Sequence, residues 1–286
     1  MKSVVVTGAS TGIGWGCARV LIASGFRVFG SVRKQADAQR LAQELGPNFT
    51  PLIFDVIDEA AVAAAAKQVE AALRGEILFG LVNNAGVAVP GPLLYQKIDD
   101  FKQQMAVNVI GHLIVVQAFA PLLGADRARK GAPGRIVMIS SVGGKNASPF
   151  LGAYNASKFA LEGMSESLRR ELMLFGIDVI VVAPGTVATT MWDRPDAINV
   201  AAFADTPYAH ALARLKVHMI TNARRGLPPE QLGETVKTAL TAARPKARYT
   251  VTPDPIETLV ANALPRRLVD TIIAGRLGLQ KRPRRA

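Results

Sequence analysis

Short apolar runs alternate with longer amphipathic stretches along most of the chain. The apolar runs are rich in β-branched residues, which is typical of strands buried on both faces. We predict strands at residues 4–6, 27–32, 51–54, 79–82, 135–140, 179–183 and 248–251. Helical periodicity between them predicts helices at 13–24, 36–45, 58–73, 99–123, 153–175 and 228–243. This alternation is typical of βαβ units, so we expect a Rossmann-type, doubly wound α/β fold with a seven-stranded parallel sheet and helices on both faces.

The segment 189–227 interrupts this alternation. It holds irregularly placed prolines and three scattered aromatic residues, Trp192, Phe203 and Tyr208. Inside a compact domain such a segment is often a lid or a binding loop. We therefore expect a single domain over residues 1–264, with a substrate-binding loop or lid at 189–227.

The remaining residues, 265–286, form a basic C-terminal tail. Residues 266–286 hold seven Lys or Arg against one Asp, a net charge of +6, which is half of the chain's +12. This charge is compatible with a solvated tail, or with peripheral contact with an anionic membrane or partner. No nucleic acid is expected as a partner, because neither interleaved aromatic residues nor a binding motif accompanies the charge.

Composition excludes several classes of protein. Hydrophobic residues make up 49% of the chain, which excludes disorder of the whole. The single cysteine, Cys17, cannot form an intrachain disulfide, and no carboxylate is spaced with the three histidines as a ligand set, so we expect no metal. Neither a signal-peptide pattern nor a run of apolar residues long enough for a membrane span is found, so we expect a cytoplasmic protein, with membrane association through the tail as the alternative.

A glycine-rich loop joins the first predicted strand to the first helix. Its sequence over residues 7–14 is Thr-Gly-Ala-Ser-Thr-Gly-Ile-Gly. Gly8 permits a sharp turn, Gly12 lets the backbone approach a pyrophosphate, and Gly14 lets the helix pack closely on the strand. The helix N-terminus then offers free N–H groups to phosphates. A tight turn without a ligand is the alternative interpretation.

The end of the second strand favours NADP(H) over NAD(H). Enzymes of this architecture that use NAD place an acid there, where it binds ribose hydroxyls. This chain has Ser31, then Arg33 and Lys34, and no acid. An arginine fork suits a 2′-phosphate, so we expect Arg33 to be the main contact and Lys34 or Ser10 a lesser one. The alternative is that Arg33 and Lys34 are ordinary solvated cations.

Ser141, Tyr154 and Lys158 form a candidate catalytic set. Tyr154 and Lys158 lie four residues apart on a predicted helix, so they share a face. A free phenol has a pKa of about 10, and a nearby ammonium can lower it by about one to three pH units, which makes Tyr154 a usable acid and base. Lys158 can also hold the nicotinamide ribose, and Ser141 can hydrogen-bond the substrate oxygen as its charge changes.

Four motifs occur in order along residues 3–190. They are the 7–14 glycine loop, Asn83-Asn84-Ala85-Gly86, Ser141 with Tyr154-x-x-x-Lys158, and Pro184-Gly185-x-x-x-Thr189. Together they make the chain similar to the short-chain dehydrogenase/reductase family. The family's usual gap of 13 residues between serine and tyrosine selects Ser141 over its neighbour Ser140.

The resemblance implies further roles. Asn108 would hold a water that connects Lys158 to solvent, Asp55 would contact the adenine, and Thr189 would bind the nicotinamide carboxamide or a phosphate. The full cofactor site that it implies comprises Gly8, Ser10, Thr11, Gly12, Ile13, Gly14, Arg33, Lys34, Asp55, Val56, Asn84, Ala85, Gly86, Tyr154, Lys158, Pro184, Gly185, Val187 and Thr189. The implied catalytic residues are Asn108, Ser141, Tyr154 and Lys158.

The stretches 141–144, 154–163 and 167–172 resemble the branch of this family that acts on steroids and retinoids. The resemblance implies hydride transfer between NADP(H) and an apolar alcohol or ketone. It also implies a homodimer or homotetramer assembled through 99–123 and 153–175. A catalytically silent NADP(H)-binding regulator or scaffold of the same fold is the alternative, and a protein that docks through its basic tail is a further one.

Overall fold

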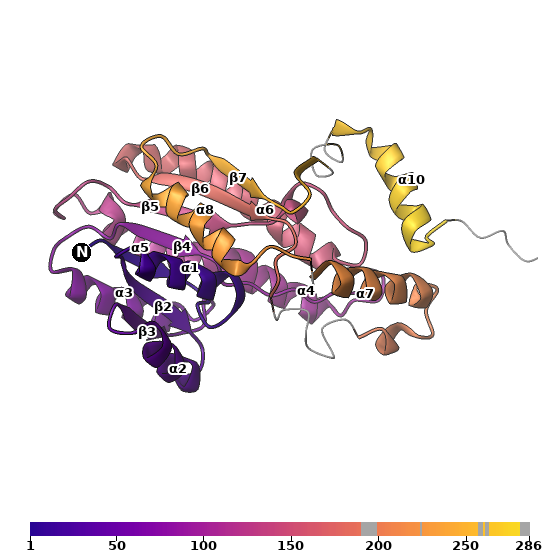
Figure 1. Cartoon of the computed structure of the whole chain (residues 1–286), viewed down its shortest axis with the longest axis horizontal. Coiled ribbons are helices and arrows are strands. Elements are labelled where there is room, and N and C mark those ends of the chain that lie inside the picture. The colour runs from indigo at the N-terminus through magenta and orange to yellow at the C-terminus, as the bar shows by residue number, and fades with distance from the viewer. Residues whose placement is uncertain (190–198, 224, 257–259, 261–262, 281–286) are drawn as a thin grey trace, which may run out of the picture.

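The computed structural model describes residues 1–189, 199–223, 225–256, 260 and 263–280 (Figure 1). A single parallel sheet of seven strands runs through it in the order β3-β2-β1-β4-β5-β6-β7. The strands are β1 (Ser3–Val6), β2 (Arg27–Val32), β3 (Phe49–Ile53), β4 (Gly80–Asn83), β5 (Arg135–Ile139), β6 (Asp178–Pro184) and β7 (Arg248–Val251). The predicted Rossmann-type fold is confirmed, with strand bounds shifted by a residue or two from those read off the sequence.

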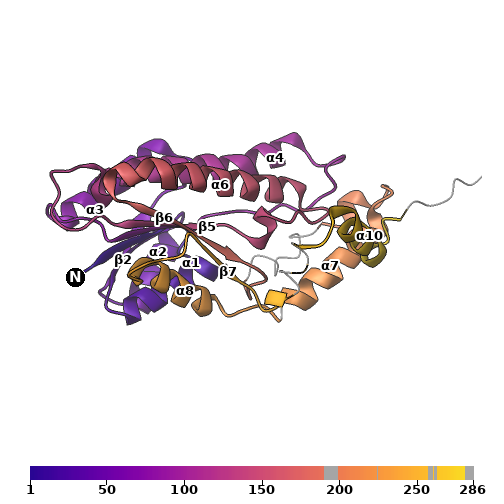
Figure 2. The same ribbon diagram turned by 90° about the horizontal axis from the view of Figure 1, so that it is seen from above.

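Helices cover both faces of the sheet (Figure 2). One face carries α1 (Gly12–Ala23), α2 (Gln35–Leu45) and α8 (Pro229–Thr241), and the other carries α3 (Glu59–Leu73), α5 (Gly111–Phe119) and α6 (Gly152–Glu171). Successive residues of β1 point to opposite faces: Val4 and Val6 join one buried core, and Val5 joins the other. Cys17 of α1 is fully buried in the first of these cores.

The predicted helix at 99–123 is one helical stretch with two changes of pitch. It consists of α4 (Ile98–Met105), a π-helical turn (Ala106–Ile110), α5, and a second π-helical turn (Pro121–Ala125). Pro121 lacks a backbone N–H, which explains the change of hydrogen bonding in the second turn. The first turn contains Asn108, and turns of this kind are frequent at functional sites.

Beyond the sheet lies a smaller lobe built on α7 (Ala209–Ala223) and α10 (Arg266–Leu277). Its own core includes Leu212 and Leu215 of α7, Leu277 of α10 and Phe150 from the loop that precedes α6. The segment expected to be a loop therefore contains a long helix, because Leu212 and Leu215 find apolar partners outside the segment.

Part of the basic tail forms the helix α10, which packs against α7 through Ile273 and Leu277. Trp192, the rest of 190–198 and the final cations at 281–286 lie outside the described residues. None of the helices in the described part of the chain is both long and apolar enough to cross a bilayer.

Candidate active site

The glycine loop has the geometry that a dinucleotide phosphate requires. Gly8 and Gly12 adopt φ values of +66° and +58°, a region that side chains disfavour. A Cβ on Gly14 would lie 2.1 Å from the Gly8 carbonyl oxygen, so only glycine allows this approach of α1 to the turn. The side chain of Thr11, the N-cap residue, makes no capping hydrogen bond, which leaves first-turn N–H groups of α1 available to an anion.

The other loop residues lie where the sequence predicted. Ser10 and Ile13 are half-buried in the loop and its following turn. The hydroxyl of Ser31, at the end of β2, accepts a hydrogen bond from the Gly8 amide at 3.0 Å. The loop is thus tied to the strand end that separates NAD from NADP enzymes.

Two cations follow that strand end. Arg33 and Lys34 are exposed, with 67% of the Arg33 side chain accessible. The Arg33 guanidinium lies 3.9 Å from the Asp55 carboxylate, too far and too exposed for a strong ion pair. Val56, next to Asp55, is buried against Gly111 of α5. The residues present at this edge suit a 2′-phosphate, because the strand end is cationic and carries no acid of its own.

The residues after β4 are held against the glycine loop. The Thr7 hydroxyl accepts hydrogen bonds from the Asn84 amide at 2.8 Å and the Ala85 amide at 3.0 Å. The Asn84 side chain donates to the Thr7 carbonyl at 2.9 Å. Gly86 is exposed beside them. A Cβ on Gly86 would lie 3.3 Å from the side-chain oxygen of Asn108, so this glycine stands close to the candidate catalytic residues.

The crossover after β6 returns to the same place. Pro184 is the last residue of β6, and the Gly185 amide donates to the Val251 carbonyl at 2.8 Å. Val187 is buried and bridges to Leu227. Thr189 lies close enough to the loop that its methyl carbon would be 3.2 Å from a Cβ on Gly12. Thr189 and the glycine loop therefore face one region. The predicted contact of Thr189 with the cofactor stays a prediction.

Ser141, Tyr154 and Lys158 come together at the carboxyl edge of the sheet. The Ser141 hydroxyl accepts a hydrogen bond from the Gly143 amide at 3.0 Å, and its side chain is hydrogen-bonded to that of Tyr154. The Lys158 ammonium donates to the Ile139 carbonyl at 2.9 Å and lies 5.8 Å from the centre of the Tyr154 ring. The structure thus brings Ser141, the serine that the family's spacing selects, into contact with the tyrosine.

The electrostatics of this set differ from the expectation. Burial raises the pKa of Tyr154, and the hydrogen bond from Ser141 opposes this only in part. Burial also lowers the pKa of Lys158 to about 8, and the charge of the Glu162 carboxylate, which raises this pKa, offsets the effect only in part. The expected lowering of the Tyr154 pKa by Lys158 is not found, because the ammonium is turned to the Ile139 carbonyl. At neutral pH the phenol is protonated and the lysine is mostly charged.

Asn108 makes more hydrogen bonds than the sequence revealed. Its side-chain oxygen accepts from the Val87 amide at 2.8 Å, and its NH₂ group donates to the Val87 carbonyl and the Ser157 hydroxyl, both at 2.9 Å. Both amide protons are therefore committed to the protein. In this arrangement the side chain joins α6 to the residues after β4. The predicted role of Asn108 in holding a water stays a prediction.

Two buried residues near Asn108 were missed. Gln104 and His112 are fully buried, one helical turn on either side of Asn108, and both hydrogen-bond the segment after β4. Each lies four residues from Asn108, so the three share one helical face, and this spacing was a signal that the sequence carried.

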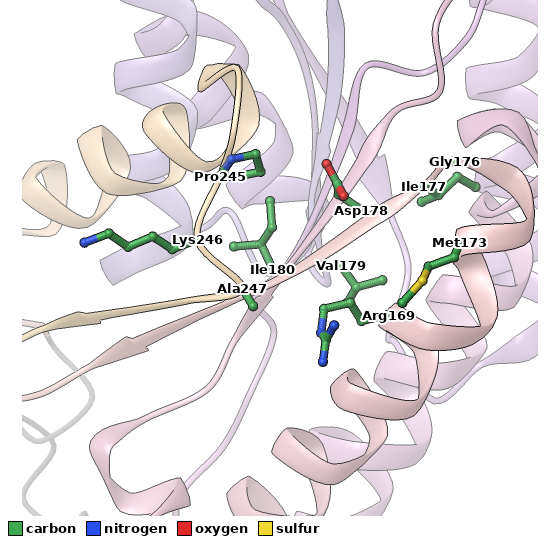
Figure 3. Close-up of a pocket in the computed structure, with 10 residues that line it drawn as sticks. All are labelled: Arg169, Met173, Gly176, Ile177, Asp178, Val179, Ile180, Pro245, Lys246 and Ala247. Atoms are coloured by element: carbon green, nitrogen blue, oxygen red, sulfur yellow. The ribbon is translucent and has the colours of Figure 1, made fainter.

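A surface pocket of about 380 Å³ lies elsewhere (Figure 3). It is lined by Arg169, Met173, Asp178 and Lys246 among others, at the amino end of β6. The carboxyl end of the same strand carries Pro184, so this pocket is separate from the candidate active site. No group of three or more His, Cys, Asp or Glu in the described part of the chain could hold a metal ion.

Comparison with known proteins identifies the family. Residues 2–197 match the family described as short chain dehydrogenase. The chain therefore belongs to the short-chain dehydrogenase/reductase family and is an oxidoreductase of the alcohol and ketone type.

Individual relatives span nearly the whole chain. The NADPH-dependent 3-dehydrocapnine reductase of Ornithobacterium rhinotracheale is 37% identical over 273 residues, 95% of this chain and 96% of that protein. Human retinol dehydrogenase 5 is 35% identical over 283 residues, 94% of this chain and 87% of that protein. A short-chain dehydrogenase structure from Streptomyces avermitilis superposes with a TM-score of 0.73 at 26% identity, over 96% of this chain and 94% of that one.

A fourth comparison concerns the fold alone. A short chain dehydrogenase/reductase from Burkholderia phymatum in complex with NAD has a TM-score of 0.76 at 24% identity, over 95% of each chain. One of the proteins compared is described as NADPH-dependent and another was solved with NAD, so the comparisons do not decide between the two cofactors.

Proposed function

We propose that this protein transfers a hydride between NADP(H) and an apolar alcohol or ketone, with Tyr154 as the proton carrier. The observation that supports this most is the hydrogen-bonded pair of Ser141 and Tyr154 beside the buried Lys158 ammonium. The set lies at the edge of a parallel sheet where ligands of open α/β folds bind.

The roles follow from the protonation states. Bound NADPH supplies the hydride. Ser141 donates a hydrogen bond to the carbonyl oxygen and Tyr154 transfers its phenolic proton to that oxygen. Lys158 would hold the nicotinamide ribose of the bound cofactor, since its ammonium lies beside the tyrosine, 5.8 Å from the centre of the ring. Because the phenol is protonated at neutral pH, this arrangement supports carbonyl reduction there, and alcohol oxidation at higher pH.

The experiment that tests the proposal is the variant Tyr154→Phe. The protein is assayed with NADPH and a panel of all-trans-retinal, a steroid ketone and cyclohexanone. We expect turnover to fall by about 10²- to 10⁴-fold, because the phenyl ring cannot donate a proton. NADPH binding, followed by cofactor fluorescence, should be retained.

The same assay tests the alternative of a silent regulator or scaffold. That alternative predicts a fluorescence change on NADPH binding without turnover of any compound by the unaltered protein. Normal turnover by the Tyr154→Phe variant would show instead that another group carries the proton.

The preference for NADP(H) is supported by the exposed cations Arg33 and Lys34 and by the absence of an acid at the end of β2. The relative named an NADPH-dependent reductase also favours it. We expect Arg33→Ala to raise the KM for NADPH about tenfold, because one charge-assisted contact is lost, and to leave the KM for NADH unchanged. Equal effects on both cofactors would contradict this preference.

An apolar substrate is supported by the surface near the smaller lobe. Leu94, Ile98 and Val217 expose 81%, 68% and 67% of their surface there. The relatives described as retinol dehydrogenases point the same way. We expect all-trans-retinal and the steroid ketone to have lower KM values than cyclohexanone.

Assembly and location are further parts of the proposal. Exposed Ile110 and Phe159, on the two long helical stretches, favour a homodimer or homotetramer. The cations of α10 and of residues 281–286 favour peripheral contact with an anionic membrane. A cytoplasmic location stays a prediction from the sequence. Sedimentation of the full chain alone measures its oligomeric state, and sedimentation with anionic vesicles measures its contact with the membrane surface.

A further inference from the structure

Three buried polar side chains lie on successive turns of the helical stretch from α4 to α5. Gln104, Asn108 and His112 are spaced four residues apart, so they share one face, and each has no exposed surface. Buried polar groups in an apolar layer carry a desolvation cost that hydrogen bonds must offset. The hydrogen-bond partners of these three side chains therefore indicate the structural role of this helical face.

Gln104 and Asn108 bind alternate residues of the segment after β4. The side-chain oxygen of Gln104 accepts from the Val89 amide at 3.0 Å. Asn108 accepts from the Val87 amide and donates to the Val87 carbonyl. The order is antiparallel, because the earlier helical residue binds the later residue of the segment.

His112 continues the series. One of its ring nitrogens, Nε2, lies 2.7 Å from the Ala85 carbonyl oxygen. A carbonyl can only accept, so Nε2 carries the proton. Burial and the charge of Lys158 lower the pKa of His112 to about 3, which keeps the ring neutral in this tautomer. The other nitrogen, Nδ1, has no hydrogen-bond partner among the residues that the structure describes.

The spacing of the two partners matches. Four residues of helix rise about 6 Å, and two residues of extended chain cover about 6.6 Å. Residues 104, 108 and 112 can therefore hold residues 89, 87 and 85 as three rungs of one ladder. We call this set the 104/108/112 ladder.

The ladder joins two functionally different ends. At the Ala85 end, the segment is bonded to Thr7 of the glycine loop. At the other end, the Gly91 amide donates to the carbonyl of Phe150, whose side chain belongs to the core of the smaller lobe. The cofactor side and the substrate side are thus held by opposite ends of one helical face.

We propose that Gln104 and His112 are positioning residues, His112 for the cofactor-binding turn through the Ala85 carbonyl and Gln104 for the substrate side through the Val89 amide. This inference rests on the proposed function, since it takes residues 84–86 to contact NADPH. The inference adds that the two ends of the ladder act separately. Loss of the His112 hydrogen bond should weaken NADPH binding alone, and loss of the Gln104 hydrogen bond should raise the KM for the carbonyl compound alone.

The first test compares His112→Leu with His112→Gln in the full-length protein. Leucine removes the donor to Ala85, and glutamine can return an N–H to nearly the same place as Nε2. We expect the dissociation constant for NADPH, from fluorescence titration, to rise about three- to tenfold in His112→Leu, and to stay within about twofold in His112→Gln. The pH profile of kcat/KM should be unchanged in His112→Gln, because His112 does not titrate in the working range.

The second test uses Gln104→Met, which keeps the length of the side chain and removes its hydrogen bonds. We expect the KM for the best-reduced compound of the carbonyl panel to rise about three- to tenfold, with NADPH affinity kept within about twofold. Ser165→Ala is the matched control: Ser165 is buried on α6, and its hydroxyl donates to the Leu161 carbonyl of the same helix. It should leave both constants unchanged.

Several results would overturn the inference. NADPH affinity that is normal in His112→Leu would do so, as would equal loss of NADPH affinity in Gln104→Met. A changed pH profile in His112→Gln would show a proton-carrying role instead. If His112→Leu does not fold, His112→Asn, too short to reach Ala85, takes its place. Failure of the unaltered protein to bind NADPH would be a failure of the proposed function itself.

Discussion

The catalytic edge of the sheet and the smaller lobe are held together in different ways. Ser141, Tyr154 and Lys158 lie above two large buried cores, and the sheet's hydrogen bonds fix the strands beneath them. The lobe depends on a small core around Leu212 and Leu277. Regions with few buried apolar contacts open at lower free energy. If the proposed function holds, we expect the chemistry to take place on the part with the large cores and the substrate to contact the part that opens more easily.

Among the variants in the sheet region, we expect Gly14→Ala to have the largest effect. The new Cβ would lie 2.1 Å from the Gly8 oxygen, so α1 must shift away from the phosphate turn. We expect NADPH to bind up to about a hundredfold more weakly, as overpacking of about 3 kcal/mol implies. Fluorescence titration measures the effect.

Gly163→Ala is the matched control for that change. Gly163 is exposed on α6, and a Cβ there meets nothing within 4 Å. We expect unchanged NADPH affinity and a gain of about 0.5–1 kcal/mol in the free energy of unfolding. Equal damage from both variants would mean that the close approach at Gly14 does not matter.

The lobe is tested next by Leu212→Ala. Loss of a buried leucine costs about 2–5 kcal/mol, a large fraction of what so small a core provides. We expect faster limited proteolysis in 199–223 and a KM for the carbonyl substrate about tenfold higher, with NADPH affinity unchanged.

Leu240→Ala, in the large core under α8, is the contrasting variant. It should lower the melting temperature of the whole domain without selective cleavage of the lobe. If Leu212→Ala and Leu240→Ala gave the same cleavage pattern, the two regions would unfold as one, and the contrast between them would not hold.

The smallest expected effect concerns pH. Glu162 raises the pKa of Lys158 against the larger effect of burial, so Glu162→Gln should lower that pKa further below about 8. The ammonium is lost as pH rises through the lysine pKa. The high-pH decline of kcat/KM for reduction should therefore begin at lower pH in the variant.

Glu166→Gln serves as the control, since Glu166 lies one turn further along α6 and pairs with Arg170 at the surface. Its profile should match that of the unaltered protein. If the pH profile of kcat/KM is the same in Glu162→Gln as in the unaltered protein, deprotonation of Lys158 does not cause the high-pH decline.

The sequence predicted those parts of the molecule that depend on local pattern. The seven strands and the turn at the glycine loop follow from periodicity and from the placement of glycines. The choice of Ser141 over Ser140 came from the resemblance to the family. The direction of the Tyr154 pKa does not follow from local pattern, because it depends on how deeply the ring is buried and on where the flexible Lys158 side chain finds its acceptor.

The lobe was missed for a related reason. The spacing of Leu212 and Leu215 is helical, but their partners, Phe150 and Leu277, come from distant parts of the chain. The same holds for Gln104 and for His112: the sequence shows that they share a face, and only the fold shows which backbone atoms they meet. Long-range contacts, rather than local preference, decided both features.

The burial of Cys17 gives the folded chain a built-in reporter. Its side chain has no exposed surface, and burial raises its pKa to about 12. Thiol reagents attack the thiolate, so the native protein should resist alkylation. The rate at which a maleimide modifies this single thiol then measures how often the layer that carries α1 opens, and saturating NADPH should slow that reaction.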